Sequence, residues 1–308
     1  MKIYRSIDEI SDLIKPAATI GTFDGVHLGH RMVIQHLNSI AKERNTESLI
    51  ITFEPHPRIV LNKDVSNLRF INNASEKAKL LEKAGVDHLL ILPFTYDFSK
   101  ITARDFIQNY LINKLHVQAM TVGYDHHFGR MDGEDEDVTV LLKEYGIAVE
   151  RIPEQDVENI SVSSTKIRKA IMEGDIPLAN GFLSYNYGLC GTVIHGNKLG
   201  RTIGFPTANL MLAFKLKLLP QDGVYAALAI FKGKTYKAML NIGFKPTVLS
   251  SERSIEVHLL DFDQEIYGEY LEVELVRKIR NEKTFPDLNS LKMQLEQDRN
   301  TVIKLLED

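Results

Sequence analysis

Short apolar runs alternate with helical patterns through the first half of the chain, and this alternation limits the possible folds more than any other feature. Helical spacing covers residues 30–44, 75–85, 103–115, 138–146 and 163–174, and Ser75 is a candidate cap for the second of these helices. Strand-like runs cover residues 17–23, 48–54, 88–94, 119–125 and 148–153. Strands and helices that alternate at this interval predict a parallel sheet with helices on both faces.

The pattern changes near residue 183, where short β-rich runs separated by glycine, asparagine or proline begin. Such runs predict a small antiparallel barrel or sandwich, and residues 288–306 form an amphipathic helix pattern. Residues 180–188 read as the connection, because they are rich in glycine and tyrosine. We therefore predict an α/β plus β chain. A doubly wound parallel-sheet domain covers residues 1–183, and a small antiparallel β-barrel domain with a C-terminal helix covers residues 184–308.

Composition disfavours several classes of function. The net charge is −4 and the pI is about 6.2, so no basic excess indicates a nucleic-acid partner. The single cysteine, Cys190, allows no disulfide within the chain and is typical of a reducing compartment. No signal-like or membrane-spanning apolar run is found in the sequence. We expect a cytoplasmic protein with small-molecule substrates and no membrane partner, and the sequence leaves the oligomeric state open.

The stretch GTFDGVHLGH, residues 21–30, follows the first predicted strand, at the sheet edge where ligands bind in α/β proteins. Its histidines, His27 and His30, are too few for zinc, which usually takes three or four ligands. No cysteine nucleophile lies near them in the sequence. The glycines let backbone N–H groups approach a ligand, and the following helix directs its positive end there, which predicts an anion site. The alternative is that each histidine only fills the loop.

A second helix start points to the same chemistry. In VSSTKIRKAI, residues 162–171, the capping residues Ser163, Ser164 and Thr165 precede the basic residues Lys166 and Arg168. Positive charge in a first helical turn is unfavourable unless an anion binds there. An ordinary capped and solvated helix is the alternative. Together, the two helix starts favour a polyphosphate ligand.

These motifs resemble a known family. The loop GxFDGxHxGH with a later SSTKIR segment is typical of nucleotidyltransferases. TFEPHPR (52–58) and GYDHHFG (123–129) are similar to the adenylyltransferase half of bacterial bifunctional riboflavin kinase/FAD synthetases. The resemblance implies that Asp125 and Phe128 bind FMN, although His126 stands where many relatives have an aromatic residue. It also implies that the histidines contact the α-phosphate and that Asp24 lies by the phosphates or Mg²⁺. The implied ATP-binding residues are Gly21, Phe23, Asp24, His27, His30, Ser164, Thr165 and Arg168.

The stretch GTVIHGNKLGRTIGFPTANL, residues 191–210, is the most specific in the chain. It lacks the spacing of a Walker A loop, and a glycine-punctuated hairpin pair would explain its glycines but not its PTAN segment. Thr207 and Asn209, two residues apart on a strand, offer two oxygens on one side, which suits Mg²⁺. The stretch resembles riboflavin kinase, and the resemblance continues through residues 222–229, 241–248, 254–275 and 279–285.

The resemblance to riboflavin kinase assigns further roles. Glu256 is implied to be the general base, although its place in an alternating strand fits a solvent-facing residue equally well. Arg280 is implied to contact the flavin. The implied ATP-binding residues of this domain are Gly196, Gly200, Gly204, Thr207 and Asn209, of which Thr207 and Asn209 hold Mg²⁺.

The expected function is a sequence of two reactions that use ATP and Mg²⁺. Riboflavin becomes FMN in the second domain, and FMN becomes FAD in the first domain with release of pyrophosphate. Two alternatives remain open from the sequence. One alternative is a riboflavin kinase with a weak or inactive adenylyltransferase half. The other is a non-catalytic flavin-sensing protein.

Overall fold

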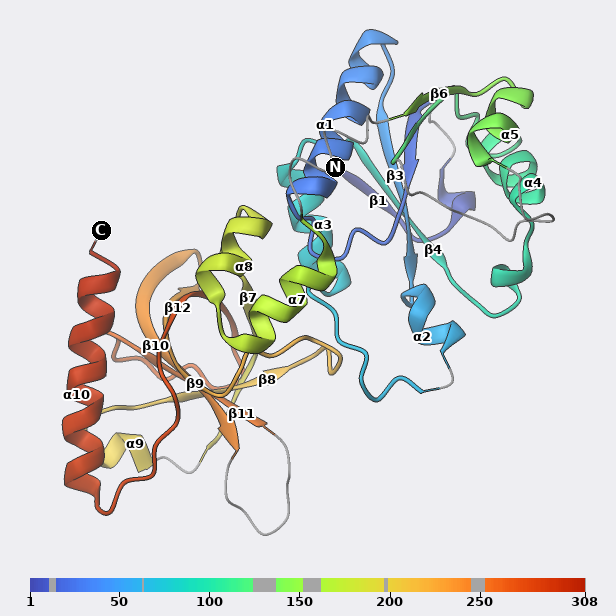
Figure 1. Cartoon of the computed structure of the whole chain (residues 1–308). Coiled ribbons are helices and arrows are strands. Elements are labelled where there is room, and N and C mark those ends of the chain that lie inside the picture. The colour runs from blue at the N-terminus through green and yellow to red at the C-terminus, as the bar shows by residue number, and fades with distance from the viewer. Residues whose placement is uncertain are drawn as a thin grey trace. The chain divides into compact units, whose positions relative to one another are not determined.

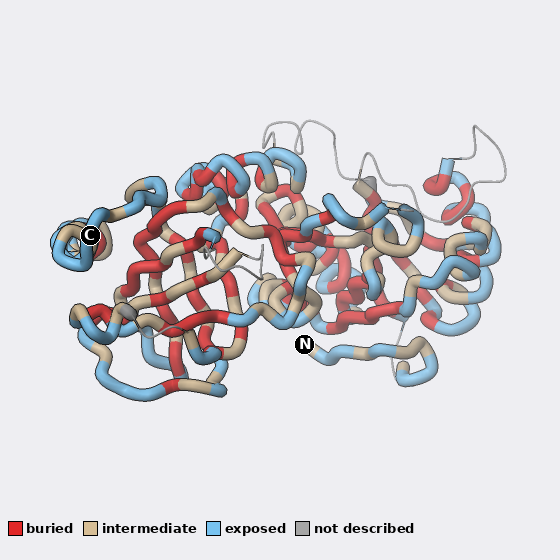
Figure 2. Tube along the Cα trace, turned by 90° about the horizontal axis from the view of Figure 1, so that it is seen from below, coloured by how far each residue is buried: buried red, intermediate tan, exposed pale blue. Residues whose placement is uncertain are grey.

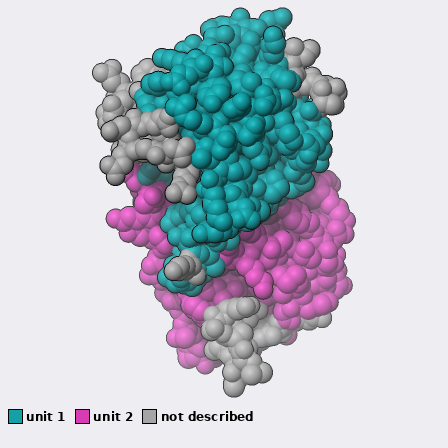
Figure 3. Space-filling model, turned by 90° about the vertical axis from the view of Figure 1, so that its right-hand side faces the viewer, with its two compact units in different colours: residues 1–164 teal, residues 165–308 magenta. Residues whose placement is uncertain are grey.

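The computed structural model describes residues 1–10, 15–62, 64–123, 137–151, 162–196, 199–244 and 253–307. The chain forms two compact units, residues 1–164 and residues 165–308 (Figure 3). The domain boundary predicted from sequence lies later, near residue 183, and it stays a prediction.

A six-stranded sheet forms the first unit, in the order β1-β4-β3-β2-β5-β6, and each neighbouring pair is parallel (Figure 1). The order reverses direction at β2, which leaves a crevice beyond the carboxyl ends of β2 and β5. The predicted strands are confirmed, and β1 adds an edge strand that the sequence did not reveal. The strands are β1 (Lys2–Tyr4), β2 (Ala17–Ile20), β3 (Ser48–Glu54), β4 (His88–Pro93), β5 (Ala119–Val122) and β6 (Ala148–Arg151).

Helices cover both faces of this sheet, as predicted (Figure 1). On one face, α1 (Leu28–Glu43) and α3 (Ala74–Lys83) bury apolar residues such as Leu37 and Leu81. On the other face, α4 (Ala103–Phe106), the π-helical turn η3 (Ile107–Ile112) and α5 (Val138–Glu144) do the same. The shorter elements are the 3₁₀ turns η1 (Ile7–Glu9) and η2 (Phe98–Lys100) and the helix α2 (Pro57–Leu61).

The prediction that Ser75 caps the helix over residues 75–85 was wrong, because that helix is α3 and Asn73 is its cap. Asn73 accepts from the backbone N–H of Glu76, and the Glu76 carboxylate accepts from the backbone N–H of Asn73. This reciprocal pair needs a glutamate three residues after the cap. Ser75 lacks such a partner and instead donates to the Asn73 side chain at 2.8 Å.

The second unit is a closed antiparallel barrel in the order β10-β11-β8-β7-β12-β9, which confirms the predicted barrel. Helix α10 (Leu288–Leu305) confirms the predicted C-terminal helix and lies beside the barrel (Figure 1). Its Val302 belongs to a buried apolar cluster with Phe205 and Met239. Two further helices are α7 (Ser164–Glu173) and α9 (Leu199–Thr202). The strands are β7 (Gly188–Ile194), β8 (Ala208–Leu212), β9 (Gly223–Phe231), β10 (Lys234–Phe244), β11 (Arg253–Leu259) and β12 (Tyr270–Arg280).

The stretch read as a connection, residues 180–188, instead begins inside a helix, α8 (Ile176–Leu183). Asp175 caps α8, and a proline lies in its first turn, which is a helix-start signal. The Asn180 side chain donates to the Leu275 carbonyl at 2.9 Å, so α8 is held against β12.

Buried residues run along the strands of each unit (Figure 2). In β3 and β4, runs of five consecutive residues are buried, because helices cover both faces of the parallel sheet. Strand β7 alternates between half-buried and buried residues, because only one face points into the barrel. Within the described residues, no helix combines the length and the apolar character needed to cross a membrane.

Candidate active sites

The loop after β2 places both predicted histidines at the start of α1. His27 is the cap of this helix, and its Nδ1 accepts from the backbone N–H of His30 at 3.3 Å. The proton of a neutral His27 ring therefore lies on Nε2. The rings of His27 and His30 stack with centroids 3.7 Å apart and an interplanar angle of 15°. Two imidazoles stacked at a helix N-terminus form a site suited to an anion.

His30 is held neutral by its surroundings. Burial, and then the neighbouring His27 and Lys77, hold its pKa well below the ordinary value of 6.5. Its buried Nδ1 atom has no hydrogen-bond partner among the described residues. The Phe23 ring lies at 5.2 Å from the His30 ring, and a side chain on Gly21 would meet Phe23 at 2.9 Å. The loop thus packs tightly around the His30 imidazole, and His30 also lines a cavity.

Asp24 is buried and connects the loop to the segment before α3. Its carboxylate accepts from the backbone N–H groups of Ile71 at 2.9 Å and Asn72 at 3.1 Å. Ser164, the last residue of the first unit, donates from Oγ to the Asp24 carbonyl at 2.9 Å. It thus contacts the loop between β2 and α1, which we call the histidine loop. The structure thus brings Gly21, Phe23, Asp24, His27, His30 and Ser164 together. The predicted contact of Asp24 with nucleotide or metal stays a prediction.

The roles of the remaining predicted residues of this site stay predictions. Thr165 is exposed and Arg168 half-buried in α7, in the second unit, and their phosphate roles stay predictions. Asp125, His126 and Phe128 lie outside the described residues. No group of three or more potential metal ligands among histidine, cysteine and acidic residues occurs in the described part of the chain.

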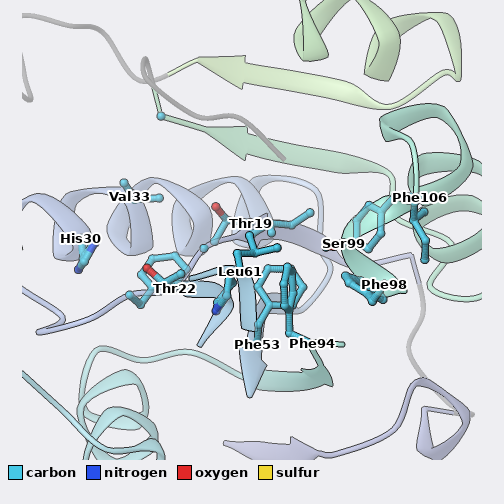
Figure 4. Close-up of a pocket in the computed structure, with 16 residues that line it drawn as sticks. Thr19, Thr22, His30, Val33, Phe53, Leu61, Phe94, Phe98, Ser99 and Phe106 are labelled. Carbon is cyan, nitrogen blue, oxygen red and sulfur yellow. The ribbon is translucent and has the colours of Figure 1, made fainter. Parts of the chain in front are cut away.

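A cavity of about 540 Å³ opens at the carboxyl ends of β2, β3 and β4. Figure 4 shows His30 and Thr22 toward one end of this cavity and Phe98 and Phe106 toward the other. Phe53 and Phe94, which also line it, meet edge to face with ring centroids 5.4 Å apart. The sequence analysis missed these aromatic residues. The signal was their position, since Phe53 is the last apolar residue of one predicted strand and Phe94 ends the next.

In the barrel, the predicted polar residues converge on one point. Glu256 in β11 is the register partner of Asn209 in β8. Thr207, just before β8, donates from Oγ1 to a Glu256 carboxylate oxygen at 3.4 Å. Asn209 is buried, whereas Glu256 and Thr207 are half-buried. Three oxygen-bearing side chains thus share one region of the barrel.

The glycines of the loop between β7 and β8 allow close approach. A Cβ atom on Gly196 would lie 2.1 Å from the Asn209 amide nitrogen. A Cβ atom on Gly200 would lie 2.2 Å from the Phe205 carbonyl oxygen. Gly204 follows α9 with a φ of +86°. A side chain at Gly196 would therefore displace the Asn209 amide, and one at Gly200 would displace the Phe205 backbone.

Two cavities meet at Thr207, which lines both. One of about 520 Å³ is lined by Arg201, Pro206 and residues 262–267. The other, of about 420 Å³, is lined by Glu256, Arg280 and apolar or aromatic residues that include Phe285. Two substrates placed in such cavities would meet beside Glu256.

Arg280 lines the second cavity but is held by an ion pair. Its Nε and a terminal nitrogen donate to the Asp298 carboxylate at 2.8–3.0 Å. Sequence reasoning missed Asp298, which looks like an ordinary charged residue of an amphipathic helix. It also missed His258, which lines the cavity and donates from Nδ1 to the Pro206 carbonyl at 2.7 Å. The direct flavin contact expected of Arg280 stays a prediction.

Two family models match the chain, that of FAD synthetase over residues 10–166 and that of riboflavin kinase over residues 183–306. A bifunctional riboflavin kinase/FMN adenylyltransferase of Listeria monocytogenes is 40% identical over 294 residues, which are 94% of this chain and 92% of that protein. The protein of the same name from Haemophilus influenzae is 39% identical over 304 residues, 98% of either chain.

A crystal structure from Streptococcus pneumoniae, described as that of a macrolide-efflux protein, has a TM-score of 0.86 and 31% identity and covers 98% of both chains. The same fold therefore occurs, over nearly the full length, in an experimentally determined structure. By the two family models and by its near full-length identity to named relatives, the chain belongs to the bifunctional riboflavin kinase/FMN adenylyltransferase family.

Proposed function

We infer that the barrel unit phosphorylates riboflavin to FMN and that the parallel-sheet unit adenylylates FMN to FAD, each with one ATP. The observation that carries this inference is the pair of family matches, one for each unit. Each match contains a set of gathered polar residues, namely the stacked histidines in one unit and Thr207, Asn209 and Glu256 in the other. We therefore assign one reaction to each unit.

In the kinase reaction, the 5′-hydroxyl of the ribityl chain attacks the γ-phosphorus of ATP. The bond from that phosphorus to the bridging oxygen breaks, and ADP leaves. An alcohol is a weak nucleophile, so its proton must pass to a base, and Glu256 takes this role in our proposal. The Thr207 hydroxyl, which donates to Glu256 at 3.4 Å, orients the carboxylate. The two cavities that meet at Thr207 support this arrangement.

Thr207 and Asn209 also fit a magnesium ion, which prefers a few oxygen ligands and retains water. The Asn209 side chain is buried against Gly196, where a Cβ atom would clash with it, so the loop is shaped to keep this amide in place. Mg²⁺ at these residues would neutralise charge on the ATP phosphates.

In the adenylyltransferase reaction, an oxygen of the FMN phosphate attacks the α-phosphorus of ATP, and pyrophosphate leaves. This nucleophile is already anionic, so the site needs positive charge and hydrogen-bond donors rather than a base. In our proposal, Nε2 of His27 and the ring of His30 donate to the α-phosphate. Ser164, Thr165 and Arg168 hold the other phosphates in our proposal. The aromatic cavity beside His30 has an apolar end suited to a flat ring.

The test uses the full-length protein with riboflavin, ATP and Mg²⁺, and the flavins are separated by chromatography over time. FMN should appear first and then give way to FAD. Glu256→Gln should lower FMN formation from riboflavin by roughly 10²- to 10⁴-fold and leave FAD formation from supplied FMN unchanged. His30→Ala should produce the opposite pattern. Each variant thus carries its own control in the other unit.

The alternatives give different results. FMN that accumulates without FAD, even when FMN is supplied, would leave a riboflavin kinase alone. Flavin that binds without any conversion would leave a flavin-sensing protein. A Glu256→Gln variant with full kinase activity would remove the general-base assignment and keep the reaction.

A further inference from the structure

Lys77 is a buried ammonium in the first unit that the proposed mechanism has not used. It lies in the first half of α3, and only 9% of the residue is exposed. Its Nζ donates to Thr52 Oγ1 at 3.4 Å, a long hydrogen bond to a neutral hydroxyl near the carboxyl end of β3. A charge removed from water needs more compensation than one such bond provides.

Two carboxylates lie near Lys77, but each is engaged elsewhere. Asp24 accepts from the backbone N–H groups of Ile71 and Asn72. Glu54 is exposed and pairs with Arg5 at 3.4 Å. Burial lowers the pKa of Lys77, and the attraction of Asp24 and Glu54 opposes this effect. The described residues offer the Lys77 ammonium no ion pair of its own.

Lys77 lies on a helix whose start is fastened to the histidine loop through Asp24. Asp24, which lies in that loop, holds the backbone immediately before α3, so the first turns of α3 are fixed beside the loop. The charge of Lys77 is one of the causes that lower the pKa of His30. His30 has its own unsatisfied buried nitrogen, Nδ1. The Lys77 ammonium therefore acts electrostatically on His30, and the backbone before its helix is fastened to the loop that leads into the anion-suited start of α1.

We propose that Lys77 is a further phosphate-binding residue of the adenylyltransferase site, and that a phosphate oxygen of a bound substrate is the counter-charge that the fold does not supply. The inference rests on the proposed adenylyltransferase function. ATP and FMN both carry such an oxygen, and the experiment distinguishes them by which Michaelis constant changes. The ammonium stabilises the negative charge that grows at the α-phosphate during attack.

The test is Lys77→Met in the full-length protein, because methionine keeps the apolar stem and removes the charge. The kcat/KM of FAD formation from FMN should fall roughly 10- to 100-fold, as expected for the loss of a charge-assisted hydrogen bond. Riboflavin kinase activity in the same molecules should be unchanged. The melting temperature of the first unit should stay equal or rise, because a buried charge has been removed. Lys83→Met is the matched control, since Lys83 is exposed on the same helix.

Two results would overturn the proposal. One is a Lys77→Met enzyme whose FAD formation stays within about twofold of the wild type in both Michaelis constants and kcat, since loss of a charged partner predicts more. The other is a loss of FAD formation that comes with a lowered melting temperature in both Lys77→Met and Lys77→Gln, which would make Lys77 structural. A wild-type protein that forms no FAD from FMN would instead remove the proposed function itself.

Discussion

The ion pair between Arg280 and Asp298 joins the last barrel strand to the C-terminal helix, and its removal has a calculable cost. Three contacts of 2.8–3.0 Å link the guanidinium to the carboxylate. The two side chains are only 14% and 4% exposed. Gln294 donates to the same carboxylate at 2.9 Å. Asp298→Ala would leave a buried guanidinium without its counter-charge, which costs about 3–5 kcal/mol in the free energy of unfolding.

The assay is urea unfolding followed by circular dichroism, since the chain has no tryptophan to serve as a fluorescent probe. The transition of the second unit should move to lower urea in Asp298→Ala, and kinase activity should fall because Arg280 lines the cavity beside Glu256. The double variant Arg280→Met/Asp298→Leu should be more stable than Asp298→Ala, because no charge then remains buried. An Asp298→Ala cost below about 1 kcal/mol, typical of an exposed pair, would refute the reasoning.

Three further predictions concern the two sites. Gly200→Ala would place a Cβ atom 2.2 Å from a backbone oxygen, so kinase activity should fall while FAD formation from FMN is retained. The pKa of His30 is lowered in the folded state, so protonation favours the unfolded chain. The melting temperature of the first unit should therefore fall as the pH drops below about 6.5, and His30→Gln should weaken this fall. Chelation of divalent cations by EDTA should stop FMN formation, and excess Mg²⁺ should restore it; activity that survives chelation would contradict the assignment of Thr207 and Asn209.

Local patterns were sufficient to predict most of the fold. The apolar run over residues 17–23 and the helical spacing over residues 30–44 predict a strand and a helix. The structure contains β2 and α1 there, although β2 ends at Ile20 and α1 begins at Leu28. The prediction of the α3 cap failed because Ser75 was chosen by residue type alone. A reciprocal cap needs a glutamate or glutamine three residues later, and Asn73 has one in Glu76. Helix α8 was missed although Asp175 and the following proline indicate a helix start, because the glycine within it was read as a break.

The parts of the sites that sequence did not reveal depend on tertiary contacts. Lys77 lies among charged residues of a helix and reads as solvent-exposed, but α3 packs on β3 and buries its ammonium. Asp298 reads as one charge of an amphipathic helix, and only the packing of α10 on the barrel brings it to Arg280. Neither burial can be deduced from spacing, because it depends on which element lies opposite.

The two sites use opposite electrostatics, and the placement of their carboxylates follows from their nucleophiles. The kinase acts on a neutral alcohol, so a carboxylate beside the reacting atoms is useful. Glu256, which accepts from the Thr207 hydroxyl, is our proposed base. The adenylyltransferase brings together an anionic phosphate and ATP, where a facing carboxylate at about 4 Å would cost about 4 kcal/mol at an effective dielectric constant of 20. The loop does contain a carboxylate, Asp24, but its oxygens accept backbone N–H groups from the segment before α3. Asp24 thereby fixes the backbone before the helix that supplies Lys77, and two backbone donors compensate part of its negative charge.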